Sequence, residues 1–293
     1  MQFEATFPAR TGLSDEKYPI LMKHKLSLCL LAFVLFSSTV FAQTKETRTV
    51  DTFSKIAFRV AGKLYLKQGS PQKVELEGKK DVLDKIETEV SNGKLTIGTE
   101  NKWNNWHWRN DDDIIVYITV KDIEGLTVSG SGDLIAQTLL TGNNFDLAVS
   151  GSGSLQAEIE ATGDLGADVS GSGNIDLKGK FKNFESHISG SGDVLLSAVI
   201  AERADFGLSG SGKIRASGTA QSVKATISGS GKVLAANLEA DKCNVRISGS
   251  GDVEINVKSE LDANISGSGS VSYKGNPSHV NSHSSGSGSI SKM

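Results

Sequence analysis

The residues that most readily suggest chemistry are the serines of a Ser-Gly-Ser-Gly motif, which occurs nine times in the chain. A serine between glycines is typical of a nucleophile turn, and a glycine-rich turn can hold a phosphate group with its backbone amides. Both kinds of site need one copy of the motif at a strand-to-helix junction, with partner residues nearby. Nine copies in a region without a helical pattern therefore predict a structural role.

Calcium binding is a second chemistry that the motif suggests, because calcium-binding nonapeptide repeats place aspartate ligands in every turn. The residue after the motif is Asp in only three of the nine copies and Lys in two. We therefore expect no cation ladder. His107, His187, His279 and His283 have no metal-ligand spacing either, so we expect no metal site and no cofactor.

Enzyme chemistry needs carboxylates and basic residues that converge on one outer face. His187 occupies an outward strand position by itself, and the other outward positions carry a mixture of Ser, Lys, Asp, Asn and Glu. No convergent set stands out. The sequence therefore predicts a protein that is not an enzyme and has no catalytic residues.

All three tryptophans, Trp103, Trp106 and Trp108, fall in one polar, Asn-rich segment. Tryptophan on such a segment can stack on sugar rings or anchor a protein partner, so these residues are the candidate binding site. The alternative is that one or two of the side chains fold down and close the end of the fold. We expect the acidic run 111–113, which follows, to be a solvated turn rather than a cation site.

The elements that position these residues follow from the spacing of the motif, which is 18 to 21 residues throughout. This period is too short for a helical-pair repeat and is typical of one coil of a β-solenoid. From Leu147 to Val169 every second residue is apolar or Gly, the pattern of an extended chain with one buried face. We predict an all-β fold, a single-stranded parallel β-helix of about 19–20 residues per coil. The copies begin at Ser129, Ser150, Ser170, Ser189, Ser209, Ser228, Ser248, Ser266 and Ser285.

In this interpretation the glycines of the motif mark the narrow edge of each coil. Both glycines of a copy fall on the inward parity, where they leave room for close approach of the walls, and both serines fall on the outward parity. Odd intervals between copies reverse the parity, so we expect a bulge or a turn residue to restore the register. The structural turn is assigned to Gly130, Gly151, Gly171, Gly190, Gly210, Gly229, Gly249, Gly267 and Gly286.

Two further segments carry a resemblance to a known family. FSKIAF at 53–58 precedes a β-rich stretch to about Val120, and LTV at 126–128 leads into the repeats. In this combination, the chain from about Thr49 onward resembles the putative auto-transporter adhesin, head GIN domain family of exported bacterial proteins. The resemblance implies a β-helix with Gly-Ser-Gly at the tight turn, similar in shape to pectin-lyase-like proteins but without their catalytic residues. It also implies a role in adhesion.

The N-terminal residues predict export. Residues 22–42 have the basic start, the short apolar run and the small residue Ala42 that are typical of a secretory signal peptide. The alternative, a membrane anchor, is disfavoured because the apolar run is shorter than the ~20 residues of a span. We therefore expect a mature chain that begins at Gln43, has no membrane span and lies in the periplasm, at the cell surface or outside a Gram-negative cell. Residues 1–21 are expected to be a start-codon extension.

The rest of the chain divides into a β-rich N-terminal segment of the solenoid, 43–120, and the repeat β-helix, 121–293. The N-terminal segment is expected to continue and cap the stack, because an open solenoid end exposes unpaired strands. Its expected elements are strands at 53–60 and 63–67 that meet across Ala61-Gly62, a strand at 73–77, a helical turn at 81–84 and a hairpin of 86–90 with 94–98.

Charge and cysteine content bear on nucleic-acid binding and on disulfide formation. The chain has a formal net charge of −3 and no basic stretch with interleaved aromatic residues, so we expect no nucleic-acid partner. Cys243 is the one cysteine after the signal segment, and it shares its parity with Val245 and Ile247. It is therefore predicted to be a small core residue without a disulfide.

Three function classes stay open. Adhesion or ligand binding at the cell envelope, with a glycan or a surface protein as partner, fits the exported repeat and the tryptophan segment. A structural envelope scaffold fits the uniform repeats, and a polysaccharide-active enzyme fits only the analogy of fold. We expect the first class, and association of identical chains stays open.

Overall fold

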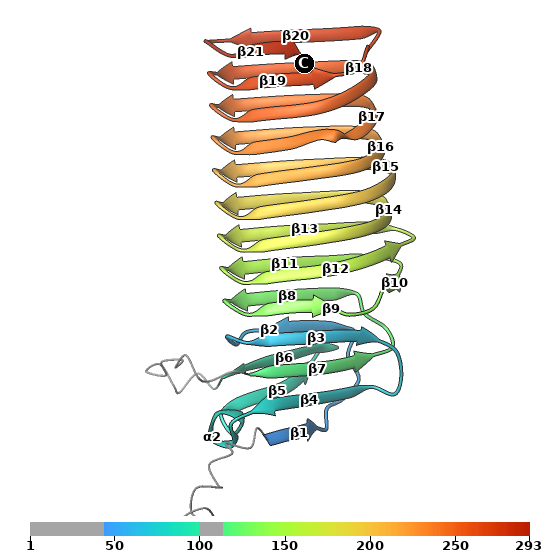
Figure 1. Ribbon diagram of the computed structural model, residues 1–293, viewed down its shortest axis with the longest axis vertical. Helices are drawn as coiled ribbons and strands as arrows, with labels where there is room; N and C mark the ends of the chain where they lie inside the picture. The colour runs from blue at the N-terminus through green and yellow to red at the C-terminus, as the bar shows by residue number, and fades with distance from the viewer. Residues whose placement is uncertain (1–43, 100–113) are drawn as a thin grey trace, which may run out of the picture. The chain divides into compact units, whose positions relative to one another are not determined.

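A computed structural model describes residues 44–99 and 114–293, which are nearly all β-structure. The strands stack coil on coil as a β-solenoid (Figure 1). This arrangement confirms the all-β solenoid that the repeat period predicts. The helix in these residues is the single turn α2, Lys80–Leu83, at the expected place.

The strand bounds are as follows. The N-terminal strands are β1 (Thr44–Arg48), β2 (Lys55–Phe58), β3 (Lys63–Gln68), β4 (Lys73–Gly78), β5 (Ile86–Ser91), β6 (Lys94–Thr99) and β7 (Ile115–Val120). The strands of the repeats are β8 (Gly125–Gly130), β9 (Asp133–Ala136), β10 (Leu140–Gly142), β11 (Phe145–Gly151), β12 (Ser154–Ala161), β13 (Asp164–Gly171), β14 (Asn174–Gly190), β15 (Asp193–Gly210), β16 (Lys213–Gly229), β17 (Lys232–Gly249), β18 (Asp252–Gly267), β19 (Ser270–Lys274), β20 (His279–Ser285) and β21 (Ser289–Lys292).

One repeat makes one coil. β11 runs toward a Ser-Gly-Ser-Gly motif and β12 leads away from it, so the two strands form opposite walls of the coil. β11 pairs in parallel with β8 of the preceding coil and with β13 of the next, and Ser150 lies opposite Ser129 and Ser170. The motifs therefore stack on one another along one edge, where the arrowheads of these strands end in Figure 1.

In the middle coils, β14 to β18, the chain is a continuous strand of 16 to 18 residues that bends around the opposite edge. The register between neighbouring coils shifts at this edge, for example between Phe181 and Asn183 and between Val199 and Arg203. Pairing on both sides of each shift is regular. The shifts confirm that bulges absorb the uneven repeat lengths, as the odd intervals predict.

The core lies between the two walls and consists of ladders of inward side chains. Phe184 stacks on Phe181 with ring centroids 5.9 Å apart and meets Phe206 edge-on at 6.1 Å. Each coil buries its apolar residues against the coils on either side, which is the main stabilising contribution in such a stack. The residues before eight of the motifs form one buried ladder: Val128, Val149, Val169, Ile188, Leu208, Ile227, Ile247 and Ile265.

Cys243 belongs to the same core. Its relative exposure is 4%, which confirms the small core residue that its parity predicts. Burial raises the pKa of its thiol to about 12, because the surrounding apolar side chains disfavour the thiolate. The thiol is therefore protonated and shielded at neutral pH.

The two glycines of a motif differ in position. The first, such as Gly210, has φ +124° and is half exposed, whereas the second, such as Gly212, is buried. The expectation that both glycines point inward is wrong for the first, because its positive φ interrupts the alternation of the strand. A Cβ on Gly210 would lie 2.4 Å from the carbonyl oxygen of Gly190, and a Cβ on Gly212 would lie 2.6 Å from that of Gly192. Neither stacked turn has room for a side chain.

The N-terminal segment continues the stack with two coils. The expected pairing of β2 with β3 across Ala61-Gly62 is wrong, because these two strands form opposite walls of one coil. β2 pairs in parallel with β6 and β8, and β3 pairs in parallel with β7 and β9. β6 ends and β7 begins at the edge of the Ser-Gly-Ser-Gly turns, since Ile97 lies opposite Phe58 and Ile115 opposite Lys63.

Antiparallel pairs follow at the N-terminal end of the stack. β4 pairs with β7, β1 pairs with β4, and β5 pairs with β6. The β5–β6 connection consists of Asn92 (φ +50°) and Gly93 (φ +71°), and it confirms the hairpin predicted there. Among the described residues, no helix is both long and apolar enough to cross a membrane.

Candidate functional site

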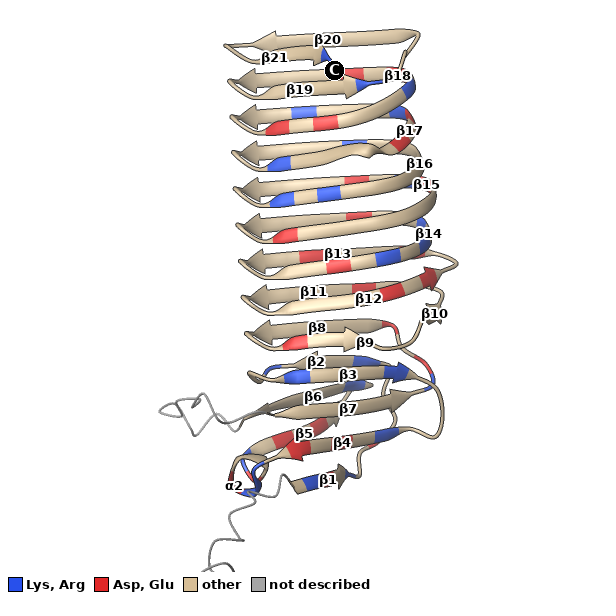
Figure 2. Cartoon of the chain, viewed as in Figure 1, with Lys and Arg blue, Asp and Glu red and all other residues tan. Residues whose placement is uncertain are grey.

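Outward side chains of the strands before each motif form columns along the stack. One column contains Asp168, His187, Gly207, Thr226 and Arg246, which lie opposite one another on successive coils. Acidic and basic residues are mixed over the coils, and Figure 2 shows both signs along the stack. A site on this face therefore depends on local geometry rather than on a field of one sign.

A neighbouring column, two residues closer to the start of each strand, carries Glu185, Asp205 and Lys224 on successive coils. Lys224 Nζ lies 2.9 Å from Asp205 Oδ2. The Asp205 side chain is only 12% exposed, whereas that of Lys224 is 45% exposed. The ion pair therefore fixes an ammonium group at the surface above a nearly buried carboxylate.

A groove of about 520 Å³ opens over the first column at Gly207. We call it the Gly207 groove. Its polar lining consists of Asp168, Ser170, His187, Ser189, Asp205, Ser209, Lys224 and Thr226. Gly207 leaves one place in the first column without a side chain. The lining residues come from β13, β14, β15 and β16, so the groove spans four successive coils of the wall.

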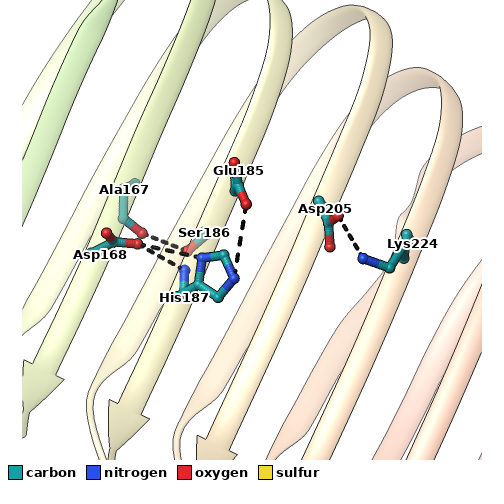
Figure 3. Close-up of polar contacts among 7 residues, drawn as sticks. All are labelled: Ala167, Asp168, Glu185, Ser186, His187, Asp205 and Lys224. Atoms are coloured by element: carbon teal, nitrogen blue, oxygen red, sulfur yellow. Dashed lines mark hydrogen bonds and ion pairs between the residues drawn. The ribbon is translucent and has the colours of Figure 1, made fainter.

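His187 is the centre of the polar contacts at this groove (Figure 3). Its backbone N–H donates to Asp168 Oδ1 at 3.1 Å. Its ring atom Nδ1 lies 3.7 Å from Asp168 Oδ1, and its ring atom Nε2 lies 3.9 Å from Glu185 Oε1. Below the surface, Ser186 Oγ donates to the carbonyl oxygen of Ala167 at 2.7 Å, which ties the His187 strand to the preceding coil.

The ring nitrogens of His187 are not held by hydrogen bonds to the two carboxylates. A catalytic imidazole is held by a hydrogen bond from a ring nitrogen to a carboxylate, and both ring distances of His187 are longer than such a bond. The His187 side chain is also 58% exposed, so water competes for its nitrogens. Within 44–99 and 114–293, no group of three or more His, Cys, Asp or Glu side chains is arranged to hold a metal ion.

A second hollow, of about 360 Å³, lies on the same wall at Gly166, next to Asp146 and Glu185. Gly166 occupies the column of Asp146, Glu185 and Asp205, again without a side chain. A third, of about 370 Å³, lies beside Arg203 and Lys242. Two of these three hollows therefore lie where an outward column has a glycine.

Of the residues singled out by the sequence, the tryptophans Trp103, Trp106 and Trp108 lie outside the described residues, as do His107 and the acidic run 111–113. The described strands β6 and β7 flank this segment at the edge of the motif turns. His187 is outward as expected, but it is flanked by two carboxylates rather than alone. Eight of the nine turn glycines are the last residues of the strands that lead into the motifs, and Gly286 directly follows β20.

Sequence reasoning missed Gly207, Asp168, Glu185 and Lys224 as members of one site. The signal was available in the repeats, because alignment of the copies on the motif puts Gly207 where neighbouring copies have His187 and Thr226. The pairing of the coils determines which outward residues lie side by side. The alternation of inward and outward residues does not determine this.

The model of the family described as putative auto-transporter adhesin, head GIN domain, matches residues 52–215 and 197–277. No curated protein matches the chain.

Solved structures share the fold. A putative lipid binding protein from Parabacteroides distasonis ATCC 8503 is 25% identical, with a TM-score of 0.64 over 86% of this chain and 96% of that one. A putative adhesin from the same strain is 21% identical, with a TM-score of 0.66 over 87% of this chain and 98% of that one. A putative adhesin from Parabacteroides merdae ATCC 43184 is 21% identical, with a TM-score of 0.63 over 86% and 96%.

Proposed function

Because the chain belongs to the putative auto-transporter adhesin, head GIN domain family, we propose that it is an exported protein that binds a ligand at the cell envelope without turning it over. The observation that carries this proposal is the family match together with open polar grooves on a rigid stack of coils. Sites on rigid elements hold their side chains in place for binding.

Export is part of the proposal. A signal peptide at 22–42 would deliver a mature chain that begins at Gln43, with no membrane span, to the periplasm or the cell surface. The family is named for adhesins, which act outside the cell. A buried, protonated thiol at Cys243 is compatible with an oxidising compartment, since it has no route to a disulfide partner.

The ligand class is a glycan or a surface protein. One structural neighbour is named a putative lipid binding protein, which raises an acyl chain as another ligand. The Gly207 groove is open and walled by Asp168, His187 and Lys224, and charged walls of this kind disfavour an acyl chain. Hydroxyl-rich or polar ligands fit such walls better.

The tryptophan segment is the proposed contact site. If Trp103, Trp106 or Trp108 is a binding hot spot, its change to Ala should weaken ligand binding by about thirtyfold, or about 2 kcal/mol, at unchanged stability. If the indoles instead close the fold, the same changes should lower the free energy of unfolding by about 3–5 kcal/mol.

The test combines acrylamide quenching with a glycan array and whole-cell binding of the chain from Gln43 onward. Trp106→Ala comes first, because Asn104 and Asn105 precede it. Phe206→Ala, a core change with 0% exposure in the parent side chain, serves as the reference for lost stability. Three well-shielded indoles, or binding that survives all three Trp changes, would remove this contact site from the proposal.

A structural scaffold is the second candidate. β20 and β21, in the last coil, each pair with the preceding coil along one edge, with β18 and β19 respectively. A strand with a free edge is a template for pairing with another chain. Concentration-dependent end-to-end assemblies in light scattering and electron microscopy would favour this function, and a monomer that binds cells would exclude it.

A further inference from the structure

We propose that the Gly207 groove is a binding subsite for a neutral oligosaccharide, an inference that rests on the proposed ligand-binding function and names the ligand class. The groove lies on the wall of the coils, separate from the edge at which β6 ends and β7 begins. Its volume of about 520 Å³ falls within the ~300–1,000 Å³ of small-molecule sites.

Gly207 is present for space rather than for its backbone conformation. The turn glycine Gly210 needs its positive φ of +124°, but Gly207 lies within β15 with φ outside the left-handed region. A Cβ on Gly207 would lie 2.7 Å from Cδ2 and 3.1 Å from Nε2 of His187. The imidazole therefore leans over Gly207, and any side chain there would displace it.

The imidazole ring of His187 lies above a groove floor that has little polar surface. The floor is formed by the strand segments around Val169, Ile188 and Leu208, which are themselves buried. The His187 ring, 58% exposed, provides one face for the C–H groups of a sugar. From Asp168 to Thr226 the groove crosses three coil spacings, about 14 Å at the usual strand separation. This length suits a short oligosaccharide that lies along the stack.

The polar walls match sugar hydroxyl groups. Within the described residues, Asp168 has His187 as its ionisable partner and no Lys or Arg. Its carboxylate can accept charge-assisted hydrogen bonds from hydroxyl groups. Lys224 uses its contact with Asp205 and still has donors for a ring or hydroxyl oxygen.

The same walls select against charged ligands. An anionic sugar would face the carboxylates of Asp168 and Asp205, and a cationic ligand would face the Lys224 ammonium. Contact between like charges at close range therefore weakens the binding of both an anionic and a cationic ligand. A neutral ligand with several hydroxyl groups avoids both penalties.

The experiment uses the chain from Gln43 to Met293 and measures binding to immobilised neutral oligosaccharides of glucose, mannose, xylose and N-acetylglucosamine. Heparin, polygalacturonate and phosphatidylcholine vesicles are the charged and lipid probes. The groove variants are Gly207→Ser, His187→Ala and the nearly isosteric Asp168→Asn. Ala148→Ser and His283→Ala are matched controls, because they occupy the same outward column outside the groove.

We expect at least one neutral oligosaccharide to bind, each groove variant to lose tenfold or more in affinity, and both controls to bind like the parent. Asp168→Asn keeps the shape of its side chain, so its loss of affinity would be informative even if Gly207→Ser were unstable. If a neutral oligosaccharide binds all groove variants as well as it binds the parent, the subsite is overturned but the proposed function is not. The same holds if the protein binds only heparin, polygalacturonate, vesicles or cell-surface protein. Absence of binding to every probe and to whole cells would overturn both.

Discussion

Replacement of a mid-stack turn glycine tests how the coils hold together. Gly210 has φ +124°, and a Cβ there would lie 2.4 Å from the carbonyl oxygen of Gly190. That carbonyl accepts hydrogen bonds from the backbone N–H groups of Ser211 at 2.9 Å and Gly212 at 3.1 Å. Gly210→Ala must therefore strain the backbone and also push apart two turns that are joined by hydrogen bonds.

The two costs can be separated, because Gly130 has a similar φ of +104° but nothing within 4 Å of its added Cβ. An L-residue in a left-handed conformation costs about 1–2 kcal/mol, which is the whole expected cost of Gly130→Ala. Overpacking adds about 1–3 kcal/mol, so Gly210→Ala should cost about 2–5 kcal/mol. At roughly 2–4 °C per kcal/mol, its melting temperature should fall by about 4–20 °C.

Denaturant melts of the parent, Gly210→Ala, Gly130→Ala and Ser209→Ala measure these differences. Ser209 is outward and exposed, so its change to Ala should cost about 1 kcal/mol or less. Because a solenoid can open locally, hydrogen exchange of the Ser211 amide should be followed as well, and it should accelerate most in Gly210→Ala. If Gly210→Ala is no more destabilising than Gly130→Ala, close stacking of the turns is not what requires glycine.

Three other outcomes are expected. Cys243 should resist thiol reagents in the native protein and react on unfolding, since its pKa is raised to about 12 and it is 4% exposed; rapid native labelling would contradict this. The Asp252 pKa is lowered by the hydrogen bond from Lys232 at 2.8 Å and by Ser270, so its stabilisation is present above the unfolded pKa and is lost as pH falls through the lower folded value. Acid melts of Asp252→Asn should therefore depend less on pH than the parent, by about 1 kcal/mol or less because the carboxylate is partly exposed. Exported protein should have an intact mass that starts at Gln43, and retention of residues 1–42 would exclude the proposed cleavage.

The repeat determined most of the fold in advance. Its period and its alternation from Leu147 to Val169 predict stacked coils, and the pairing of Ser150 with Ser129 and Ser170 follows directly once one repeat is one coil. The N-terminal coils were harder to predict, because β2 and β3 have no motif between them. Ala61-Gly62 looks like a hairpin turn, yet it occupies the position of the second half of a motif, with Lys63 opposite Asp133.

Parity was less reliable at the motif itself. Strict alternation puts both glycines inward, but a residue with positive φ does not continue the strand geometry on which alternation rests. Gly210 is therefore half exposed, and Gly212, two residues later, is buried. The same limit explains why the sequence could not say which glycine is needed for conformation and which for lack of space.

The candidate site depended on a different kind of information. In a solenoid, residues about one repeat apart become neighbours. A site therefore combines residues from several repeats rather than residues close together in the sequence. His187 looks solitary in sequence, but the register brings Asp168 and Gly207 to either side of it and places Glu185, Asp205 and Lys224 in the adjoining column. Because the motif and the core ladders fix that register, the outward residues can vary without cost to the fold. Departures from uniform columns, such as Gly207 within β15, are therefore the places where this scaffold can acquire a specific ligand.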